Sequence, residues 1–236
     1  AIEEPIKTPE LINISGSASE WVDIGFRLPG INSDDIYILP LLDGILSNGK
    51  AGLIDLNLVK SQKILSGYSQ YMIAKDYSMF KLHGEPRKDQ SLFQVQEFLL
   101  EELENIKNGN FDDWMLEAII KNFKLDDQQR NESNSYRTRK MTDAFIMNQN
   151  WSTVVNQHDK LSTIKKSDII QFANKYFNQN YAVVNKLNGK PNSIKVEKPQ
   201  ITTITLNRDT SSSFALKFQN INSNRLAPIY NNYMSD

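Results

Sequence analysis

The chain has no cysteine, only two histidines and almost no net charge. Its 236 residues carry 27 Lys plus Arg against 28 Asp plus Glu, a formal net charge of -1. The absence of cysteine excludes disulfides, thiolate metal sites and cysteine nucleophiles. The balanced charge gives no field that attracts nucleic acid or an anionic membrane surface, so we expect no nucleic-acid partner. No stretch approaches the roughly 18 consecutive apolar residues of a membrane-spanning helix, so we expect no membrane span.

The residue types that carry catalysis form no familiar constellation. His83 in KLHGEPR and His158 in NQHDK belong to neither His-x-x-Glu-His nor His-Glu-x-x-His, and no cysteine completes a zinc set. The serine of GYSQY lacks the second glycine of a nucleophile elbow. Carboxylates recur in three doublets that have no partner acid placed by the sequence: Asp34–Asp35, Asp112–Asp113 and Asp126–Asp127. We therefore expect neither a metal site nor a catalytic residue in this chain.

Hydrophobic periodicity predicts alternating strands and helices. EWVDIGFRL alternates as a half-buried strand, and the helix that follows, from about 34 to 47, contains Pro40, which predicts a bend or a later start. Two apolar stretches separated by Lys75–Asp76 predict an antiparallel hairpin. Helical stripes then recur until NYAVVNKL, which predicts a closing strand. This order predicts an α+β fold, a two-layer domain in which helices pack on one face of an antiparallel sheet.

Changes in composition divide the chain into three parts. We expect a linker over residues 1–14, where two prolines and mixed charge occur, and one α+β domain over residues 15–190. Residues 191–236 are rich in Pro, Thr, Ser and Asn at first and lose the apolar period, so we expect an extended connector toward a following domain. The start, AIEEPIKTPE, has neither an initiator Met nor a signal pattern, which indicates a processed chain or a piece of a longer one.

GILSNGKAG is one residue short of a phosphate-binding loop. Gly44, Gly49 and Lys50 match that pattern, but Ala51 stands where Ser or Thr would hold magnesium. A phosphate loop also follows a buried strand, whereas the preceding ILPLLDGIL has the pattern of a helix. We therefore expect a turn that ends this helix, with Gly49 in the left-handed conformation.

Four longer stretches resemble the insulinase, or pitrilysin, family of zinc metallopeptidases. They cover roughly residues 15–200 in the same order and spacing, each as a pattern of apolar positions with a few glycines: SGSASEWVDIGFRLPGINSDDI, LLDGILSNGKAGLIDLNLVKSQKIL, LEELENIKNGNFDDWMLEAIIKN and KSDIIQFANKYFNQNYAVVNKLNGKP. Members of that family are built from paired homologous α+β domains that enclose a peptide-binding chamber. The first domain of a pair carries an inverted zinc motif, His-x-x-Glu-His.

This chain has no such motif, so the resemblance implies the second, non-catalytic domain of a longer bacterial-type metalloendopeptidase. It implies zinc in an absent upstream domain and no cofactor here, with peptide substrates and paired peptidase domains as partners. It favours the periplasm or cell envelope over the cytoplasm. The piece should be inactive alone. The alternatives are an inactive assembly subunit of the same fold and an unrelated α+β interaction domain.

The resemblance also implies a substrate-binding position. In non-catalytic partners of the mitochondrial processing peptidase type, a glycine-rich loop follows this helix and is implicated in handling substrate. Here that turn is SNGKAG, which is poorer in glycine. By location, the resemblance implies that Gly49, Lys50 and Gly52 contact a peptide. No motif in this sequence matches the Arg and Tyr that assist the substrate in that family, so no catalytic residue is assigned.

Overall fold

A computed structural model describes residues 3–190, 197–200, 202 and 210–221. The chain divides into two units, residues 1–192 and 193–236. In the second unit, the described helix is α8 (Ser213–Gln219), which lies within the predicted connector. Much of the rest of that connector lies outside the described residues, so its extended form stays a prediction. The sheet and the remaining described helices belong to the first unit.

The first unit is built on a five-stranded sheet. Its strand order is β1-β5-β2-β4-β3, with these bounds: β1 Glu10–Gly16, β2 Trp21–Pro29, β3 Ser66–Met72, β4 Tyr77–Glu85 and β5 Tyr181–Asn188. The predicted hairpin is confirmed as β3 paired with β4, and β2 lies antiparallel to both β4 and β5. The α+β class is therefore confirmed, with one parallel pair, β1 with β5, at an edge of the sheet.

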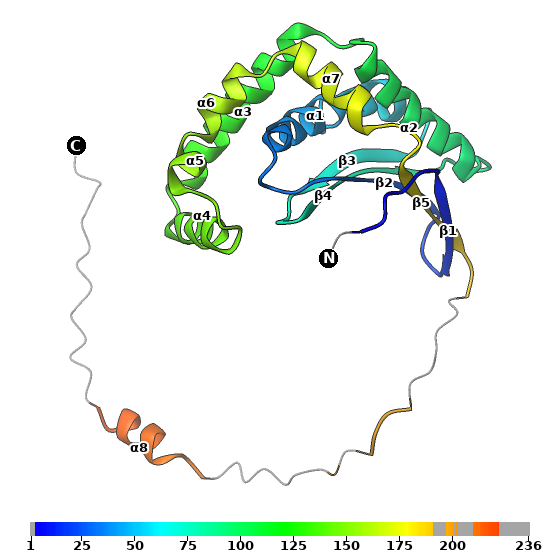
Figure 1. The fold of residues 1–236 in the computed structure, drawn as a ribbon. Coiled ribbons are helices and arrows are strands. Elements are labelled where there is room, and N and C mark those ends of the chain that lie inside the picture. The colour runs from blue at the N-terminus through cyan, green and yellow to red at the C-terminus, as the bar shows by residue number, and fades with distance from the viewer. Residues whose placement is uncertain (1–2, 191–196, 201, 203–209, 222–236) are drawn as a thin grey trace, which may run out of the picture. The chain divides into compact units, whose positions relative to one another are not determined.

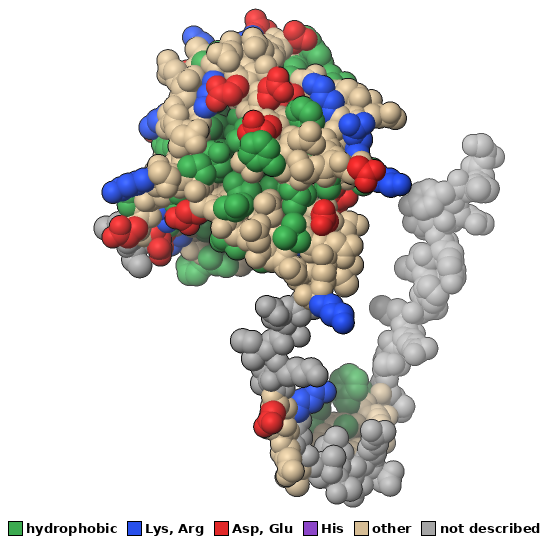
Figure 2. Space-filling view, turned by 90° about the vertical axis from the view of Figure 1, so that its right-hand side faces the viewer, with side chains coloured by type: hydrophobic (Ala, Val, Ile, Leu, Met, Phe, Trp, Pro, Cys, Tyr) green, Lys and Arg blue, Asp and Glu red, His purple; other side chains and the backbone are tan. Residues whose placement is uncertain are grey.

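Part of the segment predicted as a linker forms the edge strand β1 instead. Residues 10–14, expected to lie in a linker that ends at residue 14, form most of this strand. Its register begins with Glu10 opposite Ala182, so the strand is fixed by a partner from the other end of the domain. Figure 2 looks onto the side of the domain where β1 lies in Figure 1, and shows hydrophobic side chains gathered in the middle of that face.

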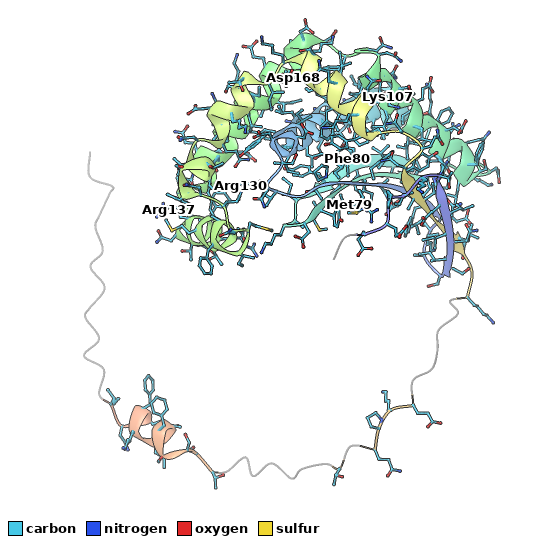
Figure 3. All side chains as sticks on the ribbon, viewed as in Figure 1. Met79, Phe80, Lys107, Arg130, Arg137 and Asp168 are labelled. Atoms are coloured by element: carbon cyan, nitrogen blue, oxygen red, sulfur yellow. The ribbon has the colours of Figure 1, made fainter. Side chains whose placement is uncertain are left out.

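The two faces of the sheet differ because side chains alternate along each strand. In β2 the residues that face the helices are almost fully buried: Val22, Ile24, Phe26 and Leu28. Figure 3 shows the same alternation in β4, where Phe80 lies on the helix side of the sheet and Met79 on the open side. The core therefore lies between the sheet and the helices.

The helices form one layer over that face of the sheet (Figure 1). The helices α1 and α2 contact the strands directly, while α7 packs on α1 and α2, and α3 packs on α1. The α-helical bounds are α1 Ile38–Leu46, α2 Leu92–Lys107, α3 Asp113–Arg130, α4 Asn134–Ile146, α5 Trp151–Val155, α6 Gln157–Thr163 and α7 Lys166–Tyr176. Short turns of 3-10 and π type occupy η1 (Asp34–Tyr37) and η2 (Asp55–Lys60).

Pro40 is accommodated by a late helix start, one of the two outcomes predicted from the sequence. The chain first forms η1, whose first turn is capped by the Ser33 hydroxyl accepting from the Asp35 N–H. The α-helix begins only at Ile38, so Pro40 lies in its first turn. N–H groups of a first turn have no partner within the helix, and a proline there removes no helical hydrogen bond.

Candidate functional site

The segment SNGKAG joins α1 to η2 on the surface of the first unit. The helix ends at Leu46 because Ser47 turns to an extended conformation with φ -148° and ψ 126°. Gly49 does have a positive φ of 74°, but it lies two residues farther on. The prediction that Gly49 ends the helix is therefore wrong, since Ser47 already leaves the helical conformation. Gly49 instead bends the loop that follows.

Two side chains hold the loop in shape by accepting its backbone N–H groups. The Asn48 Oδ1 accepts from Lys50 and Ala51 at 3.0 and 2.9 Å. The carboxylate of Asp55, which is 8% exposed, accepts from Asn48 and Gly52 at 2.9 and 3.0 Å. A phosphate loop would offer such N–H groups to its nucleotide. Here they are already bonded, and the place of an anion is taken by Asp55.

The backbone geometry of the loop explains why glycine stands at positions 49 and 52, but nothing in the described part of the structure requires a lysine at position 50. A Cβ on Gly52 would lie 2.5 Å from the Leu46 carbonyl oxygen, so only glycine fits there. Gly49 has open space around it but a positive φ, which disfavours other residues. The ammonium of Lys60 donates to the backbone carbonyl of Lys50. The exposed side chain of Lys50 itself makes no hydrogen bond, ion pair or ring contact with the described residues.

An apolar hollow borders the loop. Its volume is about 360 Å³, and Ala51 and Leu56 are among the residues that line it. Trp114 also lines it with 57% of its surface exposed, and its indole Nε1 donates to Asp112 at 3.0 Å. The cationic Lys50 is thus the chain neighbour of Ala51, which lines this hollow together with the exposed indole of Trp114. The sequence analysis did not predict this hollow, because its lining residues come from segments far apart in the chain.

The two histidines belong to separate polar groups. His83 Nδ1 lies 2.6 Å from Asp23 Oδ1, and its Nε2 lies 3.7 Å from Glu85 Oε1. Lys81 donates to the same Asp23 carboxylate at 3.0 Å. Burial raises the pKa of Asp23, but the hydrogen bonds from His83 and Lys81 outweigh that effect, so the pKa is lowered overall. An ammonium in this group disfavours a divalent cation.

His158 lies in the other group, which is centred on Asp127 of α3. Asp127 accepts from Tyr136 at 3.0 Å and from Lys140 at 2.9 Å, both on α4, and its Oδ2 lies 3.1 Å from His158 Nε2 on α6. Burial raises the pKa of Asp127. The hydrogen bonds from Lys140, His158 and Tyr136 lower it by more, so the pKa lies below its ordinary value. This group borders a cavity of about 430 Å³ and ties three helices together.

No donor set for zinc exists in the described part of the chain. There, no group of three or more His, Cys, Asp or Glu converges in a way that could hold a metal ion. Asp23 beside His83 and Asp127 beside His158 are each occupied by a lysine as well as by the imidazole. These residues therefore do not fit a zinc site.

A buried serine and a half-buried aspartate form a third polar group, which the sequence interpretation missed. Ser69 of GYSQY on β3 donates to Asp43 Oδ1 of α1 at 2.6 Å, and Ser47 Oγ lies 2.9 Å from Ser69 Oγ. Burial raises the pKa of Asp43 to about 6, and the hydrogen bond from Ser69 lowers it in part. Neither His83 nor His158 bonds to this pair, so Ser69 has no imidazole beside it that would activate it as in a Ser–His pair.

Comparison with known protein families identifies the family of this chain. Residues 2–123, just over half of the chain, match the family described as the peptidase M16 inactive domain. The chain belongs to the peptidase M16 inactive-domain family. This confirms the resemblance expected from the sequence, together with the assignment of a non-catalytic domain of a zinc-protease family with bacterial members.

Individual relatives of this inactive domain agree with the family match. The chain is 26% identical to the zinc protease PqqE of Helicobacter pylori over 168 residues, 71% of this chain and 38% of that protein. A protease structure from Helicobacter pylori has the same fold, with a TM-score of 0.73 and 22% identity, covering 78% of this chain and 45% of that one. The periplasmic protease PqqL from Escherichia coli follows with a TM-score of 0.60 and 15% identity, covering 79% and 22%.

This chain therefore covers only part of the length of its relatives. The chain spans less than half of each of these three proteins. None of the helices in the described ranges is long and apolar enough to cross a membrane.

Proposed function

We propose that this M16 inactive domain forms a non-catalytic wall of the peptide-binding chamber of a zinc-dependent metalloendopeptidase. The observation that supports this is the separation of the histidines into two lysine-containing groups, with no convergent donor set in the described residues. In this proposal, the catalytic zinc is held by another domain. We place that zinc in an upstream, paired peptidase domain of the same chain or of a partner.

We further propose that the loop with Gly49, Lys50 and Gly52 contacts the peptide. Asn48 and Asp55 fix the backbone of this loop, so Lys50 is presented at a defined position. Its ammonium has no partner among the described residues, while the neighbouring hollow offers an apolar surface beside Trp114. A cation next to an apolar hollow suits a peptide that carries an acidic residue near an apolar one.

Lys50→Ala in the full-length parent protein is the direct test of this contact. We expect kcat/KM for an acidic peptide to fall about three- to tenfold, because one exposed charge contact is lost, a difference of about 1 kcal/mol. Gly49→Ala should lower kcat/KM as well, because it disturbs the loop backbone. Lys124→Ala on α3 is the matched control, since Lys124 is also exposed. Unaltered kinetics for Lys50→Ala and Gly49→Ala would contradict the contact.

Zinc content distinguishes the proposed enzyme from an inactive assembly subunit of the same fold. The purified 236-residue chain should bind no stoichiometric zinc in elemental analysis and cleave no peptide. The parent protein should bind zinc through a His-x-x-Glu-His helix within about one domain length upstream. Stoichiometric zinc on the 236-residue chain would overturn the site assignment, and a parent without zinc would favour the inactive subunit.

We also propose that the parent acts in the periplasm or cell envelope. The support is the similarity of fold to PqqL, which is described as a periplasmic protease. Fractionation of cells that express the tagged parent protein tests this, since recovery only with the cytoplasm would exclude it.

A further inference from the structure

The strand β1 leaves one edge of the sheet open. It pairs with β5 on one side, and no other described strand lies along its outer side. Its apolar side chains are unusually exposed for a strand, with 62% of Leu11, 49% of Ile12 and 43% of Ile14 accessible. Figure 2 shows hydrophobic side chains on this face. The feature is therefore an open, apolar sheet edge.

The direction of the backbone groups follows from the end of the strand. The Gly16 carbonyl accepts from the Gly189 N–H at 3.0 Å, so Gly16 faces the β5 side. In a strand, the N–H and C=O of one residue point to the same side, and the side alternates from residue to residue. Leu11, Asn13 and Ser15 therefore direct their N–H and C=O groups outward, where they find no partner among the described residues.

Nothing in β1 protects this edge from pairing. Isolated sheet edges are commonly blunted by lysine, proline or a β-bulge. The strand sequence ELINISG contains neither lysine nor proline. Its register with β5 runs without a break from Glu10 opposite Ala182 to Gly16 opposite Asn188, so there is no bulge. The edge is competent to accept another strand.

We propose that β1 of a second copy of this chain occupies the edge, antiparallel and centred on Asn13, so that the two sheets join. The reason for a second copy is that ELINISG is complementary to itself in this register. Ile12 lies opposite Ile14 of the second copy on the open face of the sheet, and Leu11 lies opposite Ser15 of the second copy on the helix side. Glu10 lies opposite Gly16 of the second copy, so no like charges meet.

This pairing satisfies the outward-facing groups of Leu11, Asn13 and Ser15 in both copies. A two-fold interface repeats each contact, as closed dimers do. The contact is limited to one short strand and its flanks, which places it at the small end of specific interfaces. We therefore expect a dimer in the micromolar range, with a two-fold axis through Asn13.

The chain has no native cysteine, so a single Asn13→Cys tests the register directly. The two Asn13 residues form a hydrogen-bonded antiparallel pair, whose Cα atoms lie about 5.5 Å apart, within the range that a disulfide bridges. Mild oxidation of Asn13→Cys should give a cross-linked dimer as the main product on non-reducing gels. Ser15→Cys is the matched control, because its symmetric partner lies four residues away, about 13 Å along the strands.

Mixing two single variants checks the same register. Leu11→Cys and Ser15→Cys should cross-link to each other, since those positions lie opposite one another, and neither should cross-link efficiently alone. An Asn13→Cys chain that cross-links no faster than Ser15→Cys would overturn the proposal. Such a result would leave the edge to another occupant, such as an extended peptide.

Sedimentation of the unaltered chain provides an independent measurement. Its mass should rise with concentration toward twice 27.1 kDa. Asn13→Pro removes an outward N–H while the β5 side of the strand keeps its ladder, and proline is tolerated on edge strands. This variant should remain a monomer at the same concentrations, with circular dichroism confirming that it is folded. A mass of 27.1 kDa at every concentration of the unaltered chain would refute the pairing.

Discussion

Replacement of Phe177 by alanine is expected to lower the free energy of unfolding by about 3–5 kcal/mol. This ring follows α7, is 2% exposed, and packs against Phe26 and Phe80 of the sheet with centroid distances of 4.8 and 5.3 Å. It also meets Phe172 of α7 at 5.8 Å. The truncation leaves a cavity between two layers that cannot collapse into it, so the transfer and cavity costs add. Urea unfolding followed by circular dichroism measures the difference.

Phe145→Ala supplies the matched control for this prediction. Phe145 lies on α4 in the same unit and is 86% exposed, so the same truncation should change the stability by less than about 0.5 kcal/mol. Phe177→Leu should have an intermediate effect, because it retains part of the buried volume. If Phe177→Ala were no more destabilising than Phe145→Ala, the aromatic contacts between the layers would contribute little to the fold.

The part of the fold that could be predicted from sequence is the part with a local period. The strand β2 alternates buried and half-buried residues along its length, and α2 carries its buried residues at helical spacing. Such patterns are visible because each element buries one face. The strand β1 has no such pattern, since its side chains are exposed on both faces. Its position depends on pairing with β5, which lies at the far end of the domain.

The loop at Gly49 shows the same limit at the scale of a few residues. An Asn before a Gly indicates a turn, and the sequence placed the turn correctly within SNGKAG. The sequence did not show that Ser47 ends the helix or that Asp55 accepts the N–H groups of Asn48 and Gly52. Asp55 stands in the first turn of η2, where a carboxylate is a common capping group, and that was the available signal.

Asp43 gave no signal in the sequence because tertiary packing creates its environment. Within α1 it resembles a polar residue on the solvent side of an amphipathic helix. The strand β3 covers that side, and Ser69 and Tyr71 lie beside the carboxylate. Burial raises the pKa of Tyr71, and the charge of Asp43 raises it further. A helical period identifies which face is apolar, but not whether a strand also covers the polar flank.

Asp43→Asn is expected to stabilise the domain at neutral and alkaline pH. The folded-state pKa of about 6 lies above the ordinary value of 3.8, so the native state binds this proton more tightly than the unfolded chain does. The stabilising contribution is complete below the ordinary value and is lost as the pH rises through the folded-state value. Because each unit of pKa corresponds to about 1.4 kcal/mol, the loss in the unaltered chain amounts to about 1–3 kcal/mol.

Asparagine keeps an oxygen for the Ser69 hydroxyl but cannot ionise, so the variant escapes this loss. Urea unfolding from about pH 4 to about pH 8 should show similar stability for both chains in acid and a gap of about 1–3 kcal/mol in favour of the variant above pH 6. Asp159→Asn is the control, because it makes the same change at an exposed carboxylate, on α6. Parallel curves for Asp43→Asn and the unaltered chain would mean that the Asp43 carboxylate is solvated in the native state, and that its hydrogen bond with Ser69 forms in contact with water.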